Sequence, residues 1–404
     1  MCYTCTIHLP VRHSGGEDVD IEDSMKILTK MAVLTGLLLV VAGCGEAAGT
    51  AAQPDDGAEE VAEGMAALEA QNVRGAIKAF AAAARVCGTN FEARVQLALA
   101  HLRQGEVAEA DRAMREACAL CPESAEARLV DGQVAYLKKD YARARTAFSS
   151  VAAEATLPAA VRSEAFVGRG IVELAQDACD AARISFLRAL RLNPRSAAAW
   201  YHLGVLSRDT YRFNEAALEQ FEMAARLSDP RDARTKKISH ELIPALRKAL
   251  QAAAAGKPGA AKRDPAAAAK LFAEGEQLQK KKMIRAAIKK FAAAFAADPL
   301  SEAAAARYAH LLALNDKSAS GVDKALAAYR AAIDQRPGRQ DYYLAAARLA
   351  YANKRWSTAV QIMDRAVAHD PEKRATLDLL IASLLKAGKA KQAEAWKAYR
   401  AELK

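Results

Sequence analysis

The chain lacks the residue patterns on which most enzymes depend. Only 7 of its 404 residues are histidine, and no His-Glu-x-x-His, Gly-x-Ser-x-Gly or Gly-x-x-x-x-Gly-Lys-Ser/Thr motif occurs. A histidine without a second ligand nearby is more often a packing or surface residue than part of a site. We therefore expect no catalytic residue, no cofactor and no metal site, and we expect the chain not to be an enzyme.

Long apolar runs are also scarce. The main one, Met31 to Val41, follows Lys26 and Lys30 and ends at Val41-Ala42-Gly43-Cys44. Its length suits a secretory signal and is too short to span a bilayer comfortably. The pattern resembles the lipobox of bacterial lipoproteins. The resemblance implies that the signal peptide 25–43 is removed and that Cys44 carries a lipid. It also implies a lipoprotein of the bacterial cell envelope, anchored on the periplasmic face. The outer membrane is the expected location, and the sequence alone does not distinguish it from the inner membrane.

The segments on either side of this signal carry little apolar character. Residues 1–24 include Glu17, Asp18 and Asp20, which oppose a secretory signal, so we interpret them as an upstream extension before a start at Met25. Residues 44–56 are small and polar without periodicity, which predicts a flexible tether between the lipid and the folded part.

Aromatic residues make up only 6% of the chain, and prolines fall between segments rather than within them. Alanine, leucine, lysine, arginine and glutamate dominate, which favours helix throughout. The charge is uneven: residues 44–231 hold 22 basic and 26 acidic side chains, a net −4, whereas residues 232–404 hold 33 and 17, a net +16. The basic half predicts either a solvated surface or attraction to acidic partners and anionic headgroups.

What the chain does contain is a repeat. An alanine followed four residues later by a large apolar residue recurs at intervals of 34, 34, 38, 35, 70, 38 and 34 residues. The pairs are Ala76/Phe80, Ala110/Met114, Ala144/Phe148, Ala182/Phe186, Ala217/Phe221, Ala287/Phe291, Ala325/Tyr329 and Ala359/Met363. A fixed period of this size is typical of stacked repeats.

Small residues recur as well, at positions where two helices of one unit must approach closely. These are Gly64, Ala98, Gly132, Gly170, Gly204, Gly275, Ala309 and Ala347. We expect the alanines of the repeat to lie opposite them on the second helix of each unit. Prolines such as Pro194, Pro230 and Pro299 end the units, because proline cannot continue a helix.

Together these residues resemble the tetratricopeptide repeat (TPR) family. The pattern fits best in 163–196, 197–231 and 268–301, and it covers most of 57–404. The resemblance implies an all-α fold, an α-solenoid of about eight to nine tetratricopeptide-type helix pairs. Extra residues near 159–162 and 317–322 are expected between helices.

The 70-residue step from Ala217 to Ala287 indicates a break. We predict a TPR array in 57–231, a capping helix and linker in 232–266 interrupted or kinked at Pro244, and a second TPR array in 267–404. Residues 252–265 are low in complexity and linker-like. One degenerate repeat in a continuous superhelix is the alternative, since 70 is close to two periods.

The family also implies a function and a site. Its proteins hold a peptide or helix in a concave groove lined by the first helix of each repeat, so the resemblance implies a non-enzymatic, lipid-anchored scaffold for assembly of an envelope complex. Protein or peptide partners are expected, and no nucleic acid. The implied groove residues, largely apolar, are Val95, Leu99, Leu102, Leu129, Tyr136, Val167, Ile171, Tyr201, Val205 and Arg208.

Two alternatives stay open. The second array could dock on anionic lipid or an acidic polymer, or the chain could be an adaptor for cell-wall enzymes. The basic patch expected for such docking is Lys280, Lys281, Lys282, Lys289 and Lys290.

The cysteines after Cys44 leave one more choice. In an oxidising compartment Cys87 could pair with Cys118 or Cys121 and staple two repeats. The same residues could instead be packing thiols.

Overall fold

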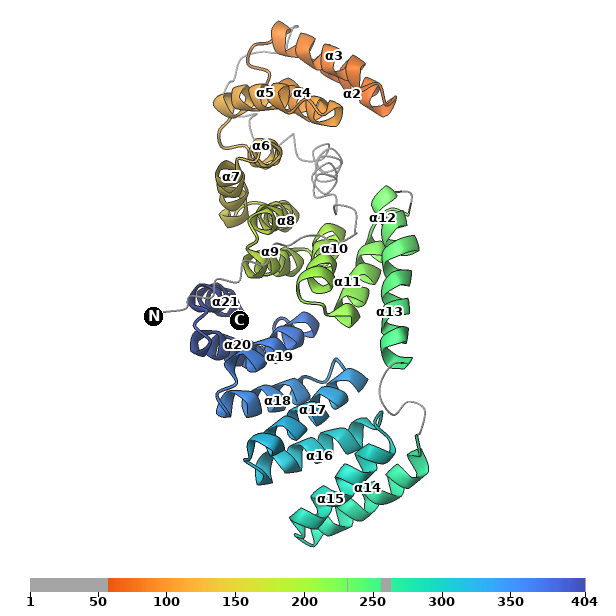
Figure 1. Ribbon diagram of the computed structural model, residues 1–404. Helices are drawn as coiled ribbons and strands as arrows, with labels where there is room; N and C mark the ends of the chain where they lie inside the picture. The colour runs from red at the N-terminus through yellow and green to blue at the C-terminus, as the bar shows by residue number, and fades with distance from the viewer. Residues whose placement is uncertain (1–56, 231, 256–262, 404) are drawn as a thin grey trace, which may run out of the picture. The chain divides into compact units, whose positions relative to one another are not determined.

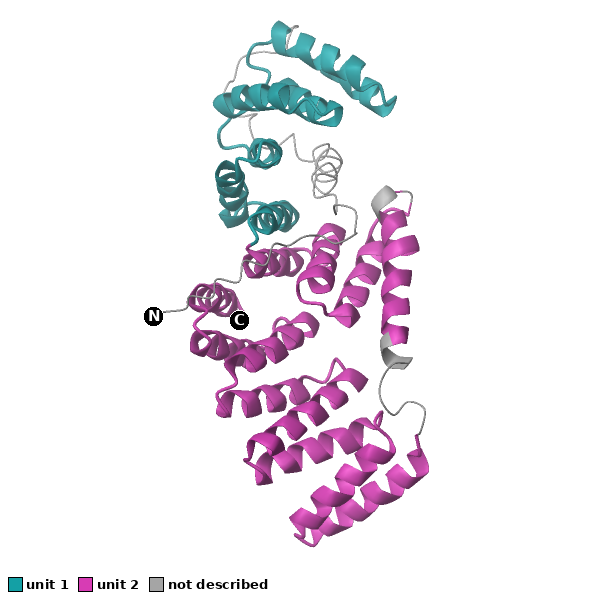
Figure 2. Cartoon of the chain, in the orientation of Figure 1, with its two compact units in different colours: residues 1–177 teal, residues 178–404 magenta. Residues whose placement is uncertain are grey.

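The computed structural model describes residues 57–230, 232–255 and 263–403, and every regular element in these ranges is helical (Figure 1). The predicted all-α solenoid is confirmed. The predictions for residues 1–56, which include the signal peptide, the tether and Cys44, and for the linker residues 256–262 concern residues outside the described ranges. Two compact units divide between Asp177 and Ala178 (Figure 2). This division groups 178–230 with the later helices, whereas the predicted array boundaries at 231 and 267 stay predictions.

Unit 1 is a row of helices in which each packs against the next along the chain. Short turns of two to five residues connect them, as is usual for antiparallel helix pairs. Its helices are α2 (Ala58–Glu69), α3 (Val73–Val86), α4 (Phe91–Gln104), α5 (Val107–Leu120), α6 (Ala125–Leu137), α7 (Tyr141–Ala153) and α8 (Ala159–Ala175).

Local capping explains where several of these helices begin. Asn90, Ser124 and Asp140 stand just before α4, α6 and α7, and each side chain accepts a hydrogen bond from the backbone N–H three residues later. Such a cap satisfies one of the backbone donors that a helix start leaves open. Gly105 ends α4 with φ 84°, a left-handed conformation that favours glycine.

Between neighbouring helices, an aromatic ring packs tightly against a glycine. A Cβ added at Gly132 would lie 2.8 Å from the ring of Phe148, and one at Gly168 would lie 2.5 Å from the same ring. Gly64 meets Phe80 in the same way. The nearest atoms to these glycines belong to the phenylalanine rings, which fill the space that glycine leaves. That the repeat alanines also lie opposite the glycines stays a prediction. The repeat alanines are themselves fully buried.

Unit 2 repeats the arrangement, with Phe221 against Gly204 and Phe291 against Gly275. Its helices are α9 (Cys179–Leu192), α10 (Ala197–Val205), the π-turn η1 (Leu206–Thr210), α11 (Asn214–Leu227), α12 (Ala233–Lys237), the π-turn η2 (Ile238–Leu242), α13 (Ile243–Ala255), α14 (Pro265–Lys280), α15 (Ile284–Ala297), α16 (Glu302–Asn315), α17 (Ala319–Gln335), α18 (Gln340–Ala352), α19 (Trp356–His369), α20 (Arg374–Lys386) and α21 (Ala390–Glu402).

The extra residues of repeats longer than 34 lie largely within helices. The 35-residue step from Ala182 to Ala217 contains η1, where Tyr211 donates its N–H to the carbonyl of Leu206 at 3.1 Å. A π-turn holds one more residue than an α-turn, which matches the one extra residue. The longer insertions behave similarly: residues 159–162 form the first turn of α8, and 319–322 the first turn of α17. Placing both insertions wholly between helices was wrong, although 317–318 do precede α17.

The segment after α11 packs on it as the predicted cap would. Ile238, Ile243 and Leu246 are buried and join a cluster with Phe221. The π-turn η2 ends immediately before α13, whose second residue is Pro244. Proline has no N–H to donate, so a change of helix type beside it is the expected form of interruption.

A charged contact within unit 2 joins segments far apart in sequence. Arg183 of α9 is buried, lies 3.2 Å from the carboxylate of Asp364 and donates to the carbonyl of Asp364 at 2.7 Å. Its guanidinium also stands over the rings of Tyr211 and Trp396. Burial raises the pKa of Asp364 to about 6 although Arg183 opposes the shift. The buried charge pair therefore joins α9 to α19, and the contact of Arg183 with Trp396 joins α9 to α21.

The glycine–aromatic contact gives a direct prediction. Gly168→Ala adds a methyl group against the Phe148 ring, and overpacking of this kind costs about 1–3 kcal/mol. The better helix propensity of alanine offsets about 1 kcal/mol of that cost. We expect a lower free energy of unfolding in urea denaturation. Gly88→Ala is the control, because no atom lies within 4 Å of the added methyl there, and it should change stability by less than about 0.5 kcal/mol.

Candidate partner-binding face

The first helices of successive repeats lie side by side. In unit 1, α4 contacts α6 and α6 contacts α8; in unit 2, α16, α18 and α20 are related in the same way. We call the surface formed by α4, α6 and α8 the A-helix face. Residues at one repeat position, 34 or 38 apart, therefore form a row that crosses the three helices.

Most of the predicted groove residues lie in the core. Val95, Leu99 and Leu102 pack in a cluster with α5 and α6, and the unit 1 members as a group are at most 7% exposed. Those members are Val95, Leu99, Leu102, Leu129, Tyr136, Val167 and Ile171. Neighbouring side chains cover these positions, so the residues do not form an exposed apolar channel. A partner contact at their edges stays a prediction.

The three predicted groove residues of unit 2 differ among themselves. Tyr201 is buried in the cluster that includes Phe221. Val205 and Arg208 are partly exposed, and Arg208 donates hydrogen bonds to Asp209 at 2.6 and 2.8 Å. These two side chains keep surface that a partner could reach.

The sequence analysis missed a row of carboxylates on the A-helix face. Glu92, Glu126 and Glu164 stand at the same repeat position, with steps of 34 and 38 residues that match those of the buried alanines. That register was the available signal. Burial, and then the charge of Glu92, raise the pKa of Glu126 to about 7. Burial, and then the charge of Glu126, raise the pKa of Glu164 to about 7. Glu126 thus lies close enough to Glu92, and Glu164 close enough to Glu126, for neighbouring carboxylates of the row to repel each other.

These carboxylates have no cation beside them. Among the described residues no ion pair or hydrogen bond involves the side chain of Glu92, Glu126 or Glu164, and Oε1 of Glu164 is buried without a partner. Buried charges in proteins are normally paired. Glu92 and Glu126 lie in the first turns of α4 and α6, where the positive end of the helix dipole favours a carboxylate. Glu164, which has a buried oxygen without a partner, is therefore the least compensated carboxylate of this face.

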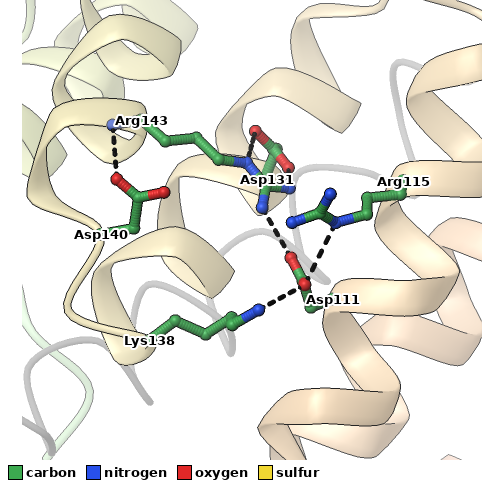
Figure 3. Close-up of polar contacts among 6 residues, drawn as sticks. All are labelled: Asp111, Arg115, Asp131, Lys138, Asp140 and Arg143. Atoms are coloured by element: carbon green, nitrogen blue, oxygen red, sulfur yellow. Dashed lines mark hydrogen bonds and ion pairs between the residues drawn. The ribbon is translucent and has the colours of Figure 1, made fainter.

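A second acidic group in unit 1 is, by contrast, fully engaged (Figure 3). Asp111 of α5 receives hydrogen bonds from Lys138 and Arg143, each at 2.6 Å, and Arg143 also binds Asp131. Arg115 completes the set at 3.2 Å. Burial alone would raise the pKa of Asp111, but the bonds from Lys138 and Arg143 outweigh it and lower that pKa to about 2. This network ties α5 to α6 and α7, which is a structural role.

The predicted basic patch is largely exposed on unit 2. Lys280, Lys281 and Lys282 lie at the turn between α14 and α15, beside Met283, which is 53% exposed. Lys289 is exposed as well, whereas Lys290 pairs with Glu274 at 2.7 Å. No ion pair of the described residues involves the other four lysines.

The cysteines and the possible metal ligands form no further site in the described residues. Cys87, Cys118, Cys121 and Cys179 form no disulfide in this structure, so of the two alternatives that the sequence left open the staple is not formed. Cys118 packs against the α4–α6 core, and burial raises its pKa to about 11. Within the described ranges, no three acidic, histidine or cysteine side chains are placed to hold a metal ion. No helix there has the length and hydropathy needed to cross a membrane.

The Asp111 network predicts a loss of stability when one of its members is removed. Asp111→Asn removes the carboxylate that Arg143 and Lys138 share, and because both partners are partly exposed we expect a cost of about 1.5–3 kcal/mol. Because the folded-state pKa is lowered, the contribution is present above pH 4 and disappears as the pH falls toward 2. Urea denaturation checks this, and Arg115→Ala, on the exposed side of the network, should cost less than about 1 kcal/mol.

The carboxylate row predicts the opposite pH dependence. The folded-state pKa of Glu164 lies above its ordinary value of 4.5, so the fold favours the protonated form. Stability is fully present below pH 4.5 and is lost as the pH rises to about 7. We expect Glu164→Gln to stabilise the protein at pH 8 by about 1–3 kcal/mol, and not at pH 4, in thermal denaturation. A pH-independent difference between variant and parent would contradict this.

Comparisons with known proteins found several solved structures that resemble this chain in part. A search of curated proteins found no match. A structure of Pseudomonas aeruginosa pilF is 20% identical and covers 50% of this chain and 93% of its own, with a TM-score of 0.40. A structure of MamA from Desulfovibrio magneticus RS-1 is 21% identical and covers 45% of this chain and all of its own, with a TM-score of 0.37. The Cut9–Hcn1 hetero-tetramer matches at 13% identity over 94% of this chain and 82% of that one, with a TM-score of 0.37. Likeness at this level says nothing about shared partners.

The family model is more decisive. The model for the tetratricopeptide repeat matches residues 61–124, 95–157, 167–232 and 310–374, which together exceed half of the chain. Proteins of this kind generally bind protein or peptide partners and are generally not enzymes. Helix pairs with aromatic rings set against small residues, repeated in the register that the model recognises, show that this chain belongs to the tetratricopeptide repeat family.

Proposed function

We propose that this protein is a non-enzymatic, lipid-anchored scaffold of the bacterial cell envelope that binds protein or peptide partners during assembly of an envelope complex. The observation that carries the proposal is the contact of α4 with α6 and of α6 with α8. These contacts place equivalent positions of successive repeats on one face, where an extended partner can touch several repeats at once. Surfaces of this kind suit recognition rather than chemistry.

The anchor part of the proposal rests on sequence. Val41-Ala42-Gly43-Cys44 follows a basic and then an apolar segment, as in bacterial lipoproteins. A cysteine with several acyl chains holds a protein on a membrane stably, whereas a single chain does not. The polar residues 44–56 would let the folded repeats reach partners at a distance from the bilayer.

Fractionation and cross-linking test the two parts separately. The native protein should sediment with membranes and release into the soluble fraction on Cys44→Ser, and a Cys44→Ser protein that stays membrane-bound would refute the anchor. Cross-linking in intact cells should then trap the same few proteins reproducibly with the native chain. Recovery of no specific cross-linked protein would refute the scaffold.

A second function is favoured by one observation on unit 2. Lys280, Lys281 and Lys282 are exposed at one turn together with the exposed apolar Met283. Lysines around an apolar tip suit the surface of an anionic bilayer, where each contributes about 1 kcal/mol. In this alternative the turn between α14 and α15 docks on anionic lipid.

Vesicle co-sedimentation tests this alternative. The protein should bind vesicles rich in anionic lipid, and binding should weaken at raised salt because exposed charges are screened. Changing Lys280, Lys281 and Lys282 to glutamine should abolish it. The matched control changes the exposed Lys354, Lys386 and Lys391 instead. Equal loss in both triple variants would show that only net charge matters and would refute a docking site.

A further inference from the structure

We propose that the A-helix face binds an extended peptide segment whose lysine or arginine side chains pair with Glu92, Glu126 and Glu164. The inference rests on the proposed scaffold function and gives its partner a chemistry. It starts from a row of carboxylates that the fold brings together and leaves without cations.

The first step is that the protein does not supply the missing cations itself. Neither Glu126 nor Glu164 has a basic group near enough to counter the effect of burial. The arginines nearest in sequence are committed to other partners: Arg94 to Glu116 at 3.2 Å, Arg128 to Glu154 at 2.6 Å and Arg162 to the carbonyl of Ala152 at 3.2 Å.

The second step is that the row is not simply a solvated surface. Glu164 Oε1 is buried and accepts no hydrogen bond, and all three side chains are only partly exposed. A carboxylate removed from water without a cation is costly to the fold, and a bound cation would relieve that cost. The geometry therefore points to a positively charged ligand.

The third step distinguishes the kind of cation. The described residues hold no group of acidic side chains placed to share one metal ion, so the three carboxylates do not converge on a point. They lie instead on three successive helices, and neighbouring helices typically pack about 8–10 Å apart. A ligand that satisfies all of them must carry several positive groups at about that spacing.

An extended peptide meets this spacing. In a polyproline II conformation, three residues make one turn and advance about 9 Å, so every third side chain points the same way. Lysine or arginine at every third position would then reach successive glutamates. A β-strand is less suitable, because its side chains alternate between faces.

The test measures binding of a fluorescein-labelled peptide of repeated Lys-Pro-Pro units to the full chain by fluorescence anisotropy. We expect saturable binding, and we expect Glu126→Gln with Glu164→Gln to weaken it by about tenfold or more. The matched control is Glu109→Gln with Glu123→Gln, which removes the same charge from exposed side chains and should bind as the parent does. Thermal denaturation of both double variants verifies that they fold.

Several outcomes would overturn the inference. These are no binding by the parent chain, equal weakening in the two double variants, or equal affinity for a peptide of the same composition with its lysines in one block. Tighter binding of a helical peptide with lysine at every seventh residue, a spacing of about 10 Å, would overturn the extended conformation.

The result is separable from the scaffold proposal. If cross-linking recovers the same native partner from the parent chain and from the Glu126/Glu164 double variant, the inference fails and the scaffold stands. If the parent chain recovers no partner at all, the scaffold fails whatever the peptide shows.

Discussion

One contact recurs through the structure and organises it: an aromatic ring from the second helix of a repeat fills the space left by a glycine on a first helix. Phe148 illustrates it best, because its ring meets Gly132 of α6 and Gly168 of α8. A single side chain thereby fixes how closely a repeat closes and how its first helix meets the next one. The ring is rigid and the glycines carry no Cβ. This contact therefore sets the spacing of successive repeats.

This spacing decides what the A-helix face can present. Packing at close range buries the apolar side chains between helices and leaves the outer positions for recognition. Two groups of charges show the difference that follows. Asp111 is surrounded by Lys138 and Arg143 and serves the fold, whereas Glu126 and Glu164 share a buried setting with no cation. We therefore place partner recognition at the unpaired carboxylates of the A-helix face.

Much of this could be predicted from the sequence, and the failures have a common cause. The period of 34 predicted the helix pairs, and Gly64, Gly132, Gly204 and Gly275 were identified as close-packing residues because glycine within a helix is costly without a reason. Gly168 was not among the predicted residues, because its role depends on how α8 packs against the Phe148 ring. The burial of the groove residues could not be predicted, because a single-helix pattern does not show how deeply the next repeat covers Leu99 or Ile171. The π-turn at Leu206–Thr210 was missed because one extra residue is as compatible with a longer loop. The glutamate row was overlooked because its effect depends on burial, which sequence spacing alone does not show.

The most direct test of this account is a proton NMR experiment on protein with labelled phenylalanine and glycine. It should show nuclear Overhauser contacts from the Phe148 ring to the α protons of both Gly132 and Gly168, since the ring lies against both glycines. Contacts to both would confirm that one aromatic side chain joins a repeat to its successor. A contact to only one glycine, or to neither, would contradict the claim on which the A-helix face depends.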